Sequence, residues 1–131
     1  MLKERTSSGS PWEAAVGYSR AVRVGKYVHV AGTTGIDASG RPVSDDPYEQ
    51  ARRALEIIRS ALEELGATLE DVVRTRIYVT NIDDWERVGK AHGECFANVR
   101  PASTMVEVSR LINPGILVEI EADACVGERD D

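Results

Sequence analysis

Apolar and polar residues alternate along two stretches in the C-terminal third of the chain, residues 100–111 and 116–124. A period of two is the pattern of a strand that buries one face. In the second stretch the two faces also differ in chemistry. One face would carry Val118, Ile120, Ala122 and Ala124, and the other Glu119, Glu121, Asp123 and Cys125. The pattern therefore predicts two strands, the second of which presents a row of acids.

Two other stretches have apolar residues at the spacings of three and four that predict amphipathic helices. The first begins where Asp46 can cap the helix and Pro47 can occupy its first position, and it stops at Gly66. The second begins at Asp83 or Asp84 and runs to about residue 98. Their apolar stripes are Ala51, Ala54, Leu55, Ile58, Leu62 and Leu65 in the first, and Trp85, Val88, His92, Cys95 and Phe96 in the second.

Three more strands are predicted between residues 21 and 80. Residues 21–24 and 27–31 are short apolar runs joined by a two-residue turn with glycine, which favours a hairpin. Along residues 72–80, a face with Val73, Thr75, Ile77 and Val79 opposes one with Arg74, Arg76, Tyr78 and Thr80. Because the arginines complement the acids of the last strand, we expect the two strands to be neighbours, with their charged faces turned away from the helices.

The predicted order is two strands, a helix, a strand, a helix and two strands, which is typical of an α+β sandwich with both helices on one face of the sheet. At 131 residues the chain is expected to form a single domain over residues 1–131. Residues 1 to about 15 are polar and rich in turn formers, so we expect an N-terminal tail there. A C-terminal tail is expected at about 126–131.

The acidic charge balance argues against a non-specific nucleic-acid binder. The net charge is −6 and the pI is near 5.0, whereas such a protein is expected to carry a basic patch. No apolar run approaches a membrane span and no secretory pattern opens the chain, so we expect a cytoplasmic protein. Cys95 and Cys125 match no metal motif and are expected to be reduced thiols, and no ligand cluster predicts a metal or cofactor.

Several segments resemble the RidA family, also called YjgF or reactive-intermediate deaminase proteins and often labelled endoribonuclease L-PSP. The resemblance implies a chorismate-mutase-like fold with an antiparallel-rich mixed sheet. It also implies a homotrimer whose sheets form a central barrel, with a small-molecule metabolite bound in clefts between subunits. The matching segments are Gly17-Tyr-Ser-Arg-Ala21, Val30-Ala-Gly-Thr-Thr-Gly35, Asp71-Val-Val-Arg-Thr-Arg-Ile-Tyr-Val79, Arg100-Pro-Ala-Ser-Thr104 and Val118-Glu-Ile-Glu-Ala122.

The resemblance also assigns candidate site residues. Glu119 matches the family's cleft glutamate, which is thought to position or activate the water that attacks an imine carbon, and an apolar wall would raise its pKa. Tyr18 matches a cleft tyrosine, although a packing role is an alternative. Gly32 and Thr33 match a loop that lines the cleft, where glycine lets the backbone approach a ligand or a neighbouring chain.

The two histidines have different expectations. His29 lies within an apolar run and is most simply a residue on a strand face. His92 lies on the apolar stripe of the second helix, so it is either a hydrogen-bonded core residue or a cleft residue, because many members of the family carry an aromatic residue there. In a cleft, an imidazole could bind substrate or exchange protons near neutral pH.

Ser103 departs from the family pattern. Members that deaminate imines of amino acids carry an arginine here, which clamps the substrate carboxylate. A charge-assisted pair contributes roughly 1.5–3 kcal/mol, so its loss would weaken carboxylate binding on the order of 10- to 150-fold. Arg100 or Arg76 could replace it, although Arg100 could equally be a solvent-exposed arginine. Otherwise the hydroxyls of Ser103 and Thr104 suit a neutral polar group.

Three functions follow as hypotheses. The first is a deaminase or related C–N hydrolase, with Glu119 positioning water and a substrate class shifted by Ser103. The second is a metabolite-binding or protein-protecting trimer without catalysis, because a fold does not determine a function. The third, ribonuclease activity, is the family's historical label and fits the acidic charge least well.

Overall fold

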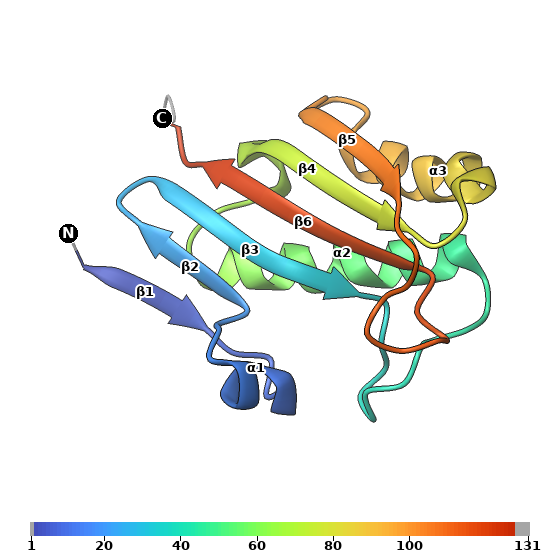
Figure 1. The fold of residues 1–131 in the computed structure, drawn as a ribbon. Helices are drawn as coiled ribbons and strands as arrows, with labels where there is room; N and C mark the ends of the chain where they lie inside the picture. The colour runs from blue at the N-terminus through green and yellow to red at the C-terminus, as the bar shows by residue number, and fades with distance from the viewer. Residues whose placement is uncertain (1, 128–131) are drawn as a thin grey trace.

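The computed structural model describes residues 2–127, and within them the chain forms one six-stranded sheet with the order β1-β2-β3-β6-β4-β5 (Figure 1). All neighbouring strands are antiparallel except β4 and β5, which are parallel. The strands are β1 Lys3–Thr6, β2 Ala21–Val24, β3 Tyr27–Thr34, β4 Val72–Val79, β5 Ala102–Glu107 and β6 Val118–Cys125. Most of the expected C-terminal tail, residues 128–131, lies outside the described part.

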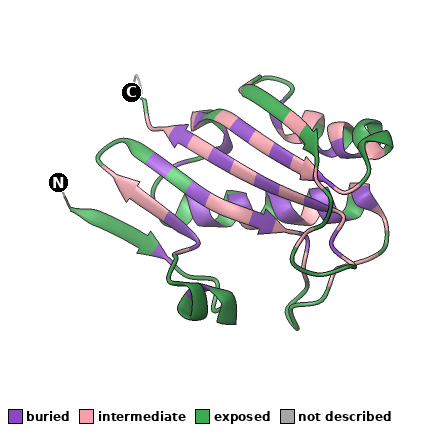
Figure 2. Cartoon of the chain, in the orientation of Figure 1, coloured by how far each residue is buried: buried purple, intermediate pink, exposed green. Residues whose placement is uncertain are grey.

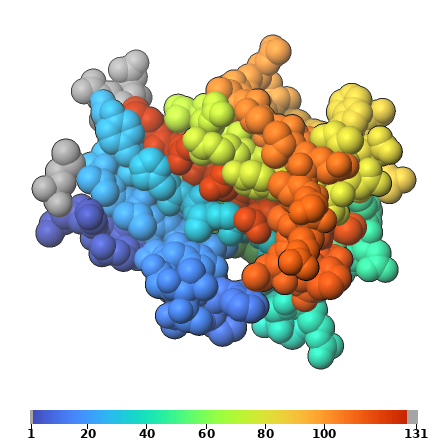
Figure 3. All heavy atoms as spheres, in the orientation of Figure 1, coloured from blue at the N-terminus to red at the C-terminus, as the bar shows by residue number. Residues whose placement is uncertain are grey.

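Two long helices, α2 (Pro47–Glu64) and α3 (Trp85–Phe96), lie on the same face of the sheet, as Figure 1 shows. The other face is free of helices, and Figure 3 shows its strands side by side. A short helix, α1 (Pro11–Val16), lies at one end, and the 3-10 turns η1 (Leu69–Asp71) and η2 (Ile82–Asp84) flank β4. The expected α+β architecture with two helices on one face is confirmed.

The alternation along β6 is confirmed. Its apolar residues are buried beneath α2 and its polar residues are half-buried on the other face, and Figure 2 shows this as a purple and pink alternation. The apolar stripe predicted for α2 is also buried throughout. The Asp46 side chain accepts a hydrogen bond from the Tyr48 N–H, and Gly66 has a φ of 79° just after the helix.

The predicted pairing of the charged strands is correct. In the ladder between β4 and β6, Arg74 lies opposite Asp123 and Arg76 opposite Glu121. The Arg76 Nη1 atom lies 3.0 Å from the Asp123 Oδ2 atom, and the Tyr78 hydroxyl donates to the Glu121 Oε1 atom at 2.6 Å. This charged face of the sheet is the one away from α2 and α3.

The expected N-terminal tail is wrong for most of its length. Residues 3–6 form β1, which pairs antiparallel with β2, and residues 11–16 form α1, capped by Ser10. Glu13 is buried and accepts hydrogen bonds from the Ser8 backbone N–H and hydroxyl. This polar segment is structured because β1 pairs with a strand distant in sequence and because the Glu13 carboxylate is buried and hydrogen-bonded. Neither feature requires apolar residues at regular spacings, so the sequence pattern does not reveal it.

Three smaller expectations also differ from the structure. Val73 lies at a register irregularity in β4 and is 53% exposed, so it does not share the core face of Thr75. Trp85 is 55% exposed, because it is the first residue of α3, and the apolar stripe of this helix is buried only from Val88 onward. The cap before α3 also differs, because Asn81 caps the preceding turn while the Asp84 side chain makes no capping bond.

A fully buried glutamine ties the helix layer to the start of β6. The Gln50 amide nitrogen donates to the Ser44 and Gly115 carbonyls, each at 2.8 Å, and its oxygen accepts from the Leu117 N–H at 2.8 Å. These bonds satisfy three backbone groups of two loops that have no strand partner there. Gln50 therefore fixes the chain two residues before Glu119.

Replacing Gln50 with Met should lower the free energy of unfolding by on the order of 3 kcal/mol, since each buried backbone group left without a partner costs about 1–3 kcal/mol. Urea denaturation of Gln50→Met and of the exposed control Arg52→Met measures the difference. Equal midpoints for the two variants would show that the loops do not depend on the Gln50 bonds.

Candidate functional site

Glu119 lies at the start of β6, opposite Tyr78 on β4 and Thr34 on β3. Its side chain is half-buried, and within residues 2–127 its carboxylate accepts no hydrogen bond and forms no ion pair. A Cβ atom at position 32 would overlap the Glu119 Oε2 atom, so glycine is what lets this carboxylate keep its place. Gly32 thus permits a close approach, as expected, but to an acid of the same chain.

Burial is the main reason why the pKa of Glu119 lies above its ordinary value, and the neighbouring Glu121 raises it further. Arg20 acts in the opposite direction and lowers this pKa. A carboxyl group that keeps its proton more readily than usual can serve as an acid or a base closer to neutral pH. The environment of Glu119 therefore shifts its pKa in the direction that favours general acid–base chemistry.

Arg20 is a buried cation that the sequence analysis did not single out. Its Nη1 atom donates to the Thr33 hydroxyl at 3.2 Å, and its Nε atom lies 4.0 Å from the Glu13 Oε2 atom. The Nε atom is buried without a hydrogen-bond partner among the described residues. The guanidinium carbon lies 5.7 Å from the centre of the Tyr18 ring. Arg20 thus connects Tyr18 to Thr33.

One signal could have pointed to Arg20. It stands two residues after Tyr18, and alternate residues of an extended segment share a face. The expected loop at residues 32–35 is also different, because β3 continues to Thr34 through an irregular register. Figure 3 shows a hollow beside this end of β3 (cyan), between the α1 segment (blue) and the segment after β5 (orange).

His92 and Ser103 belong to a second group of side chains. The His92 Nε2 atom lies 2.9 Å from the Thr75 hydroxyl, which lies 2.8 Å from the Ser103 hydroxyl. Thr75 is fully buried, His92 is half-buried and Ser103 is exposed. Burial lowers the pKa of His92, which favours the neutral imidazole. The ring of Phe96 packs beside it at 4.7 Å.

Arg100 lies next to this second group. It follows α3 with a φ of 55°, and its backbone N–H bonds to the Phe96 carbonyl at 2.8 Å. Together with His92 and Pro101 it lines an open hollow of about 270 Å³. The other arginine considered as a substitute, Arg76, is paired with Asp123. Arg100 is therefore the more available of the two.

The strand register separates the two groups within one chain. Ser103 pairs with Thr75, whose side chain faces α3, whereas Glu119 pairs with Tyr78, on the alternate face of β4. Arg20 connects Tyr18 and Thr33 and acts on Glu119, which lies beside Gly32, so these residues form one group. His92, Arg100 and Ser103 form another. A single chain does not bring all the expected site residues together.

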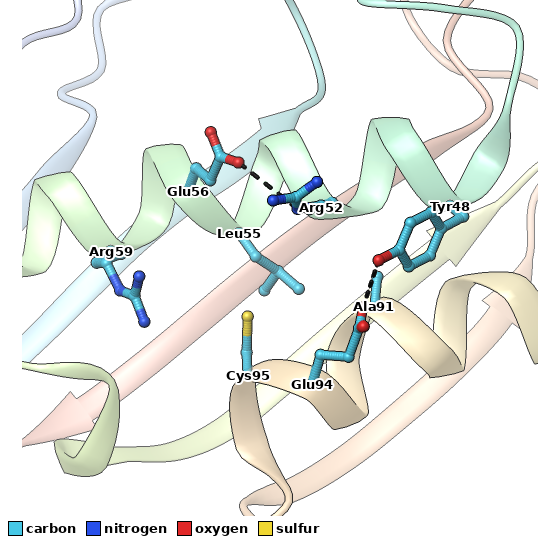
Figure 4. Close-up of a pocket in the computed structure, with 8 residues that line it drawn as sticks. All are labelled: Tyr48, Arg52, Leu55, Glu56, Arg59, Ala91, Glu94 and Cys95. Carbon is cyan, nitrogen blue, oxygen red and sulfur yellow. Dashed lines mark hydrogen bonds and ion pairs between the residues drawn. The ribbon is translucent and has the colours of Figure 1, made fainter.

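Another hollow, of about 430 Å³, lies between α2 and α3 (Figure 4). None of the expected site residues lines it. The Tyr48 hydroxyl donates to Glu94 at 2.6 Å across it, and Cys95 points into it. Burial raises the pKa of the Cys95 thiol, which makes it a poor nucleophile at neutral pH. The Cys95 thiol in this hollow is therefore not activated by its surroundings.

Two further features are absent from the part of the chain that the structure describes. No three histidine, cysteine, aspartate or glutamate side chains gather closely enough to hold a metal ion. No helix combines the length and apolar character that crossing a membrane requires.

Replacing Arg20 with Gln should raise the pKa of Glu119 further, because it removes the one nearby charge that favours the carboxylate. A ¹³C NMR titration of the glutamate carboxyl groups measures this pKa in the folded protein. Arg41→Gln, in an exposed turn, is the matched control and should leave it unchanged. An unchanged or lower Glu119 pKa in Arg20→Gln would contradict the electrostatic link.

Comparison with known proteins places this fold and these residues in a family. The model of the family described as Endoribonuclease L-PSP matches residues 9–126. A crystal structure of a YjgF-family member from Mycobacterium tuberculosis is 56% identical and superposes with a TM-score of 0.89, covering 95% of this chain and all of the other. This likeness confirms the chorismate-mutase-like fold.

Two curated relatives agree. A RutC family protein of Pyrococcus abyssi is 41% identical over 82% of this chain and 84% of its own length. The human 2-iminobutanoate/2-iminopropanoate deaminase is 32% identical over 96% of this chain and 93% of its own length. Similarity of this extent, over nearly the whole chain in the human relative, goes beyond a shared fold. The protein belongs to the RidA/YjgF family, which the Endoribonuclease L-PSP model describes.

Proposed function

We propose that this protein is a hydrolase of small enamines or imines, or of a related C–N bond, that acts in clefts between the subunits of a homotrimer. The observation that carries the proposal is the half-buried, unpaired Glu119 carboxylate held against the Gly32 backbone. A relative named as an imine deaminase gives the reaction class its support. The cleft, the trimer and the roles of individual residues are parts of the proposal.

In the proposed reaction, water adds to the carbon of a C=N bond while Glu119 accepts a proton from the water. Glu119 returns this proton to the nitrogen, which gives a carbinolamine. It then takes the proton of the new hydroxyl group and delivers it to the nitrogen as the C–N bond breaks, so that ammonia leaves and a C=O group remains. An enamine first gains a proton at carbon and loses one from nitrogen, which gives the imine. Proton transfer of this kind requires a carboxyl group with a raised pKa, which fits the environment of Glu119. The Tyr18 ring, Gly32 and Thr33 would orient the substrate.

The separation of the two residue groups supports a cleft built from two copies. Glu119 on β6 and Ser103 on β5 face opposite sides of the sheet and are separated by β4, so one substrate could touch both only if they come from different subunits. The helix-free face of the sheet also carries exposed apolar side chains, Tyr27 and Val73 among them, that suit an interface. A homotrimer is the assembly that family membership suggests.

The substrate is expected to differ from the usual imines of amino acids. Ser103 occupies the place of the carboxylate-binding arginine, and a hydroxyl forms one neutral hydrogen bond where the arginine would form a charged pair. Ser103 also favours the alternative function, a metabolite-binding or protein-protecting trimer without catalysis. Ribonuclease activity has little support beyond the name of the family model, because the net charge is −6 and Glu121 and Asp123 line the same face as Glu119.

Glu119→Gln should lower the rate of ammonia release by roughly 100-fold or more, since general acid–base catalysis contributes about 10²–10⁴-fold. The measurement uses neutral imines and amino-acid imines generated in situ. Glu121→Gln is the matched control, because it changes a neighbouring acid that already binds Tyr78, and should retain most activity. Equal activity of wild type and Glu119→Gln would remove the proposed role of Glu119.

Ser103→Arg tests the substrate class in the same assay. We expect its preference to shift toward amino-acid imines, in which a carboxylate is available to pair with the new guanidinium. Binding of a neutral ligand without turnover by any variant would support the non-catalytic alternative instead.

Mixing two inactive variants should restore activity if each cleft takes Glu119 from one copy and Ser103 from another. After joint refolding of Glu119→Gln with Ser103→Trp, roughly a quarter of the clefts would combine two intact residues by random assortment. Light scattering should give a mass of three times 14.3 kDa. A mixed trimer that stays inactive, while each parent folds, would contradict the shared cleft.

A further inference from the structure

Three side chains from three elements form a continuous hydrogen-bonded chain. His92 on α3 contacts Thr75 on β4 at 2.9 Å, and Thr75 contacts Ser103 on β5 at 2.8 Å. The inner end is half-buried, the middle is fully buried and the outer end is exposed. The chain therefore connects a helical imidazole to a hydroxyl on the edge strand of the sheet.

The buried Thr75 hydroxyl has one hydrogen, so the two bonds must run in the same direction. If Thr75 donates to Ser103, it accepts from the His92 Nε2–H, and the Ser103 hydrogen is free to donate outward. If Thr75 donates to His92, it accepts from Ser103, which then offers only lone pairs. The tautomer of His92 thus determines whether Ser103 presents a donor or an acceptor.

The first direction fits the structure better. In it Thr75 donates to the Ser103 oxygen and accepts from the imidazole proton on the Nε2 atom. The opposite direction would place this proton on Nδ1, which has no hydrogen-bond acceptor among the described residues, whereas in the first the hydrogen left over lies on the exposed Ser103, where a ligand or water can accept it. The outer end of the chain is therefore a single neutral donor.

We propose that Ser103 is a specificity-determining residue that donates one hydrogen bond to a neutral acceptor of the ligand, such as an amide or carbonyl oxygen, with Thr75 and His92 as positioning residues. Serine at position 103 then belongs to a recognition site whose hydroxyl is oriented by Thr75 and His92. The ligand role rests on the proposed function, whereas the direction of the chain is a property of the folded protein alone.

The same geometry explains why a neutral group suits this position. A carboxylate would receive one hydrogen bond from a hydroxyl and would leave its charge without a cation in the chain, because His92 is neutral. An amide or ketone oxygen needs no such charge. The chain itself therefore favours a neutral group, and Arg100 beside it is the cation that an anionic ligand would need.

Ser103→Ala tests the chain without any ligand. The Thr75 hydrogen loses its outer acceptor, so Thr75 should turn and donate to His92, and the imidazole proton should move from Nε2 to Nδ1. The ratio of the two tautomers should change on the order of 5- to 150-fold, which reflects the cost of an unbonded buried hydrogen. Imidazole ¹³C and ¹⁵N chemical shifts report the tautomer directly, and the chain has only two histidines.

Two controls make this measurement specific. Thr104→Ala removes the next hydroxyl along β5, which contacts Arg74, and should leave the His92 tautomer unchanged. The exposed His29, which bonds to Asp123, should not respond to either variant. A folded Ser103→Ala protein whose His92 retains the wild-type tautomer would overturn the proposal.

Ligand binding tests the recognition step with 2-oxopropanamide and its anionic counterpart, 2-oxopropanoate. Wild type should favour the neutral probe relative to Ser103→Arg, which should favour the anion. Thr75→Val should weaken binding of the neutral probe several-fold and Thr75→Ser should restore it, which a packing role alone would not produce. Equal preference in wild type and Ser103→Arg would overturn the role of Ser103.

The outcomes also separate this inference from the proposed function. If no imine is hydrolysed but the tautomer and the probe preference respond as expected, the enzyme proposal fails and the recognition site stands. If imines are hydrolysed but Ser103→Ala changes neither tautomer nor preference, the enzyme proposal stands and the recognition site fails.

Discussion

The register between β4 and β6 is the constraint on which the rest of the structure depends. It turns every second residue of both strands toward α2 and α3, where the apolar side chains form the core. A slip of one residue would turn one of the two strands over, and would bury either Arg76 in place of Ile77 or Glu121 in place of Ile120. One strand register therefore determines both which side chains form the core and which charged side chains face away from the helices.

On the charged face, most groups are compensated and one is not. Arg76 pairs with Asp123, and Tyr78 donates to Glu121, so these side chains offset one another where they are half-buried. Glu119 has the same kind of burial without a partner in the described chain, and its pKa rises in consequence. An uncompensated acid beside compensated neighbours is more readily explained by chemistry than by stability.

The second residue group changes the meaning of serine at position 103. In the sequence, comparison with the family pattern indicates only that serine at position 103 replaces an arginine. In three dimensions the Ser103 hydroxyl ends a chain through Thr75 to His92, which a long cationic side chain could not complete, because arginine has no acceptor. Two residues outside the Arg100–Thr104 segment, Thr75 and His92, thereby set the orientation of the Ser103 hydroxyl.

Local periodicity in the sequence was enough to determine the core-facing stripe of α2, the two faces of β6 and the pairing of charged strands, because burial imposes these patterns residue by residue. Family resemblance placed Glu119 and Ser103 among the candidate residues. Only the tertiary structure decided that residues 3–6 pair with β2, that Val73 leaves the core face, and that Arg20 reaches Thr33. These features depend on contacts between segments distant in sequence, and such contacts leave no period in the chain. For the same reason, only the fold could bring His92, Thr75 and Ser103 into one hydrogen-bonded chain.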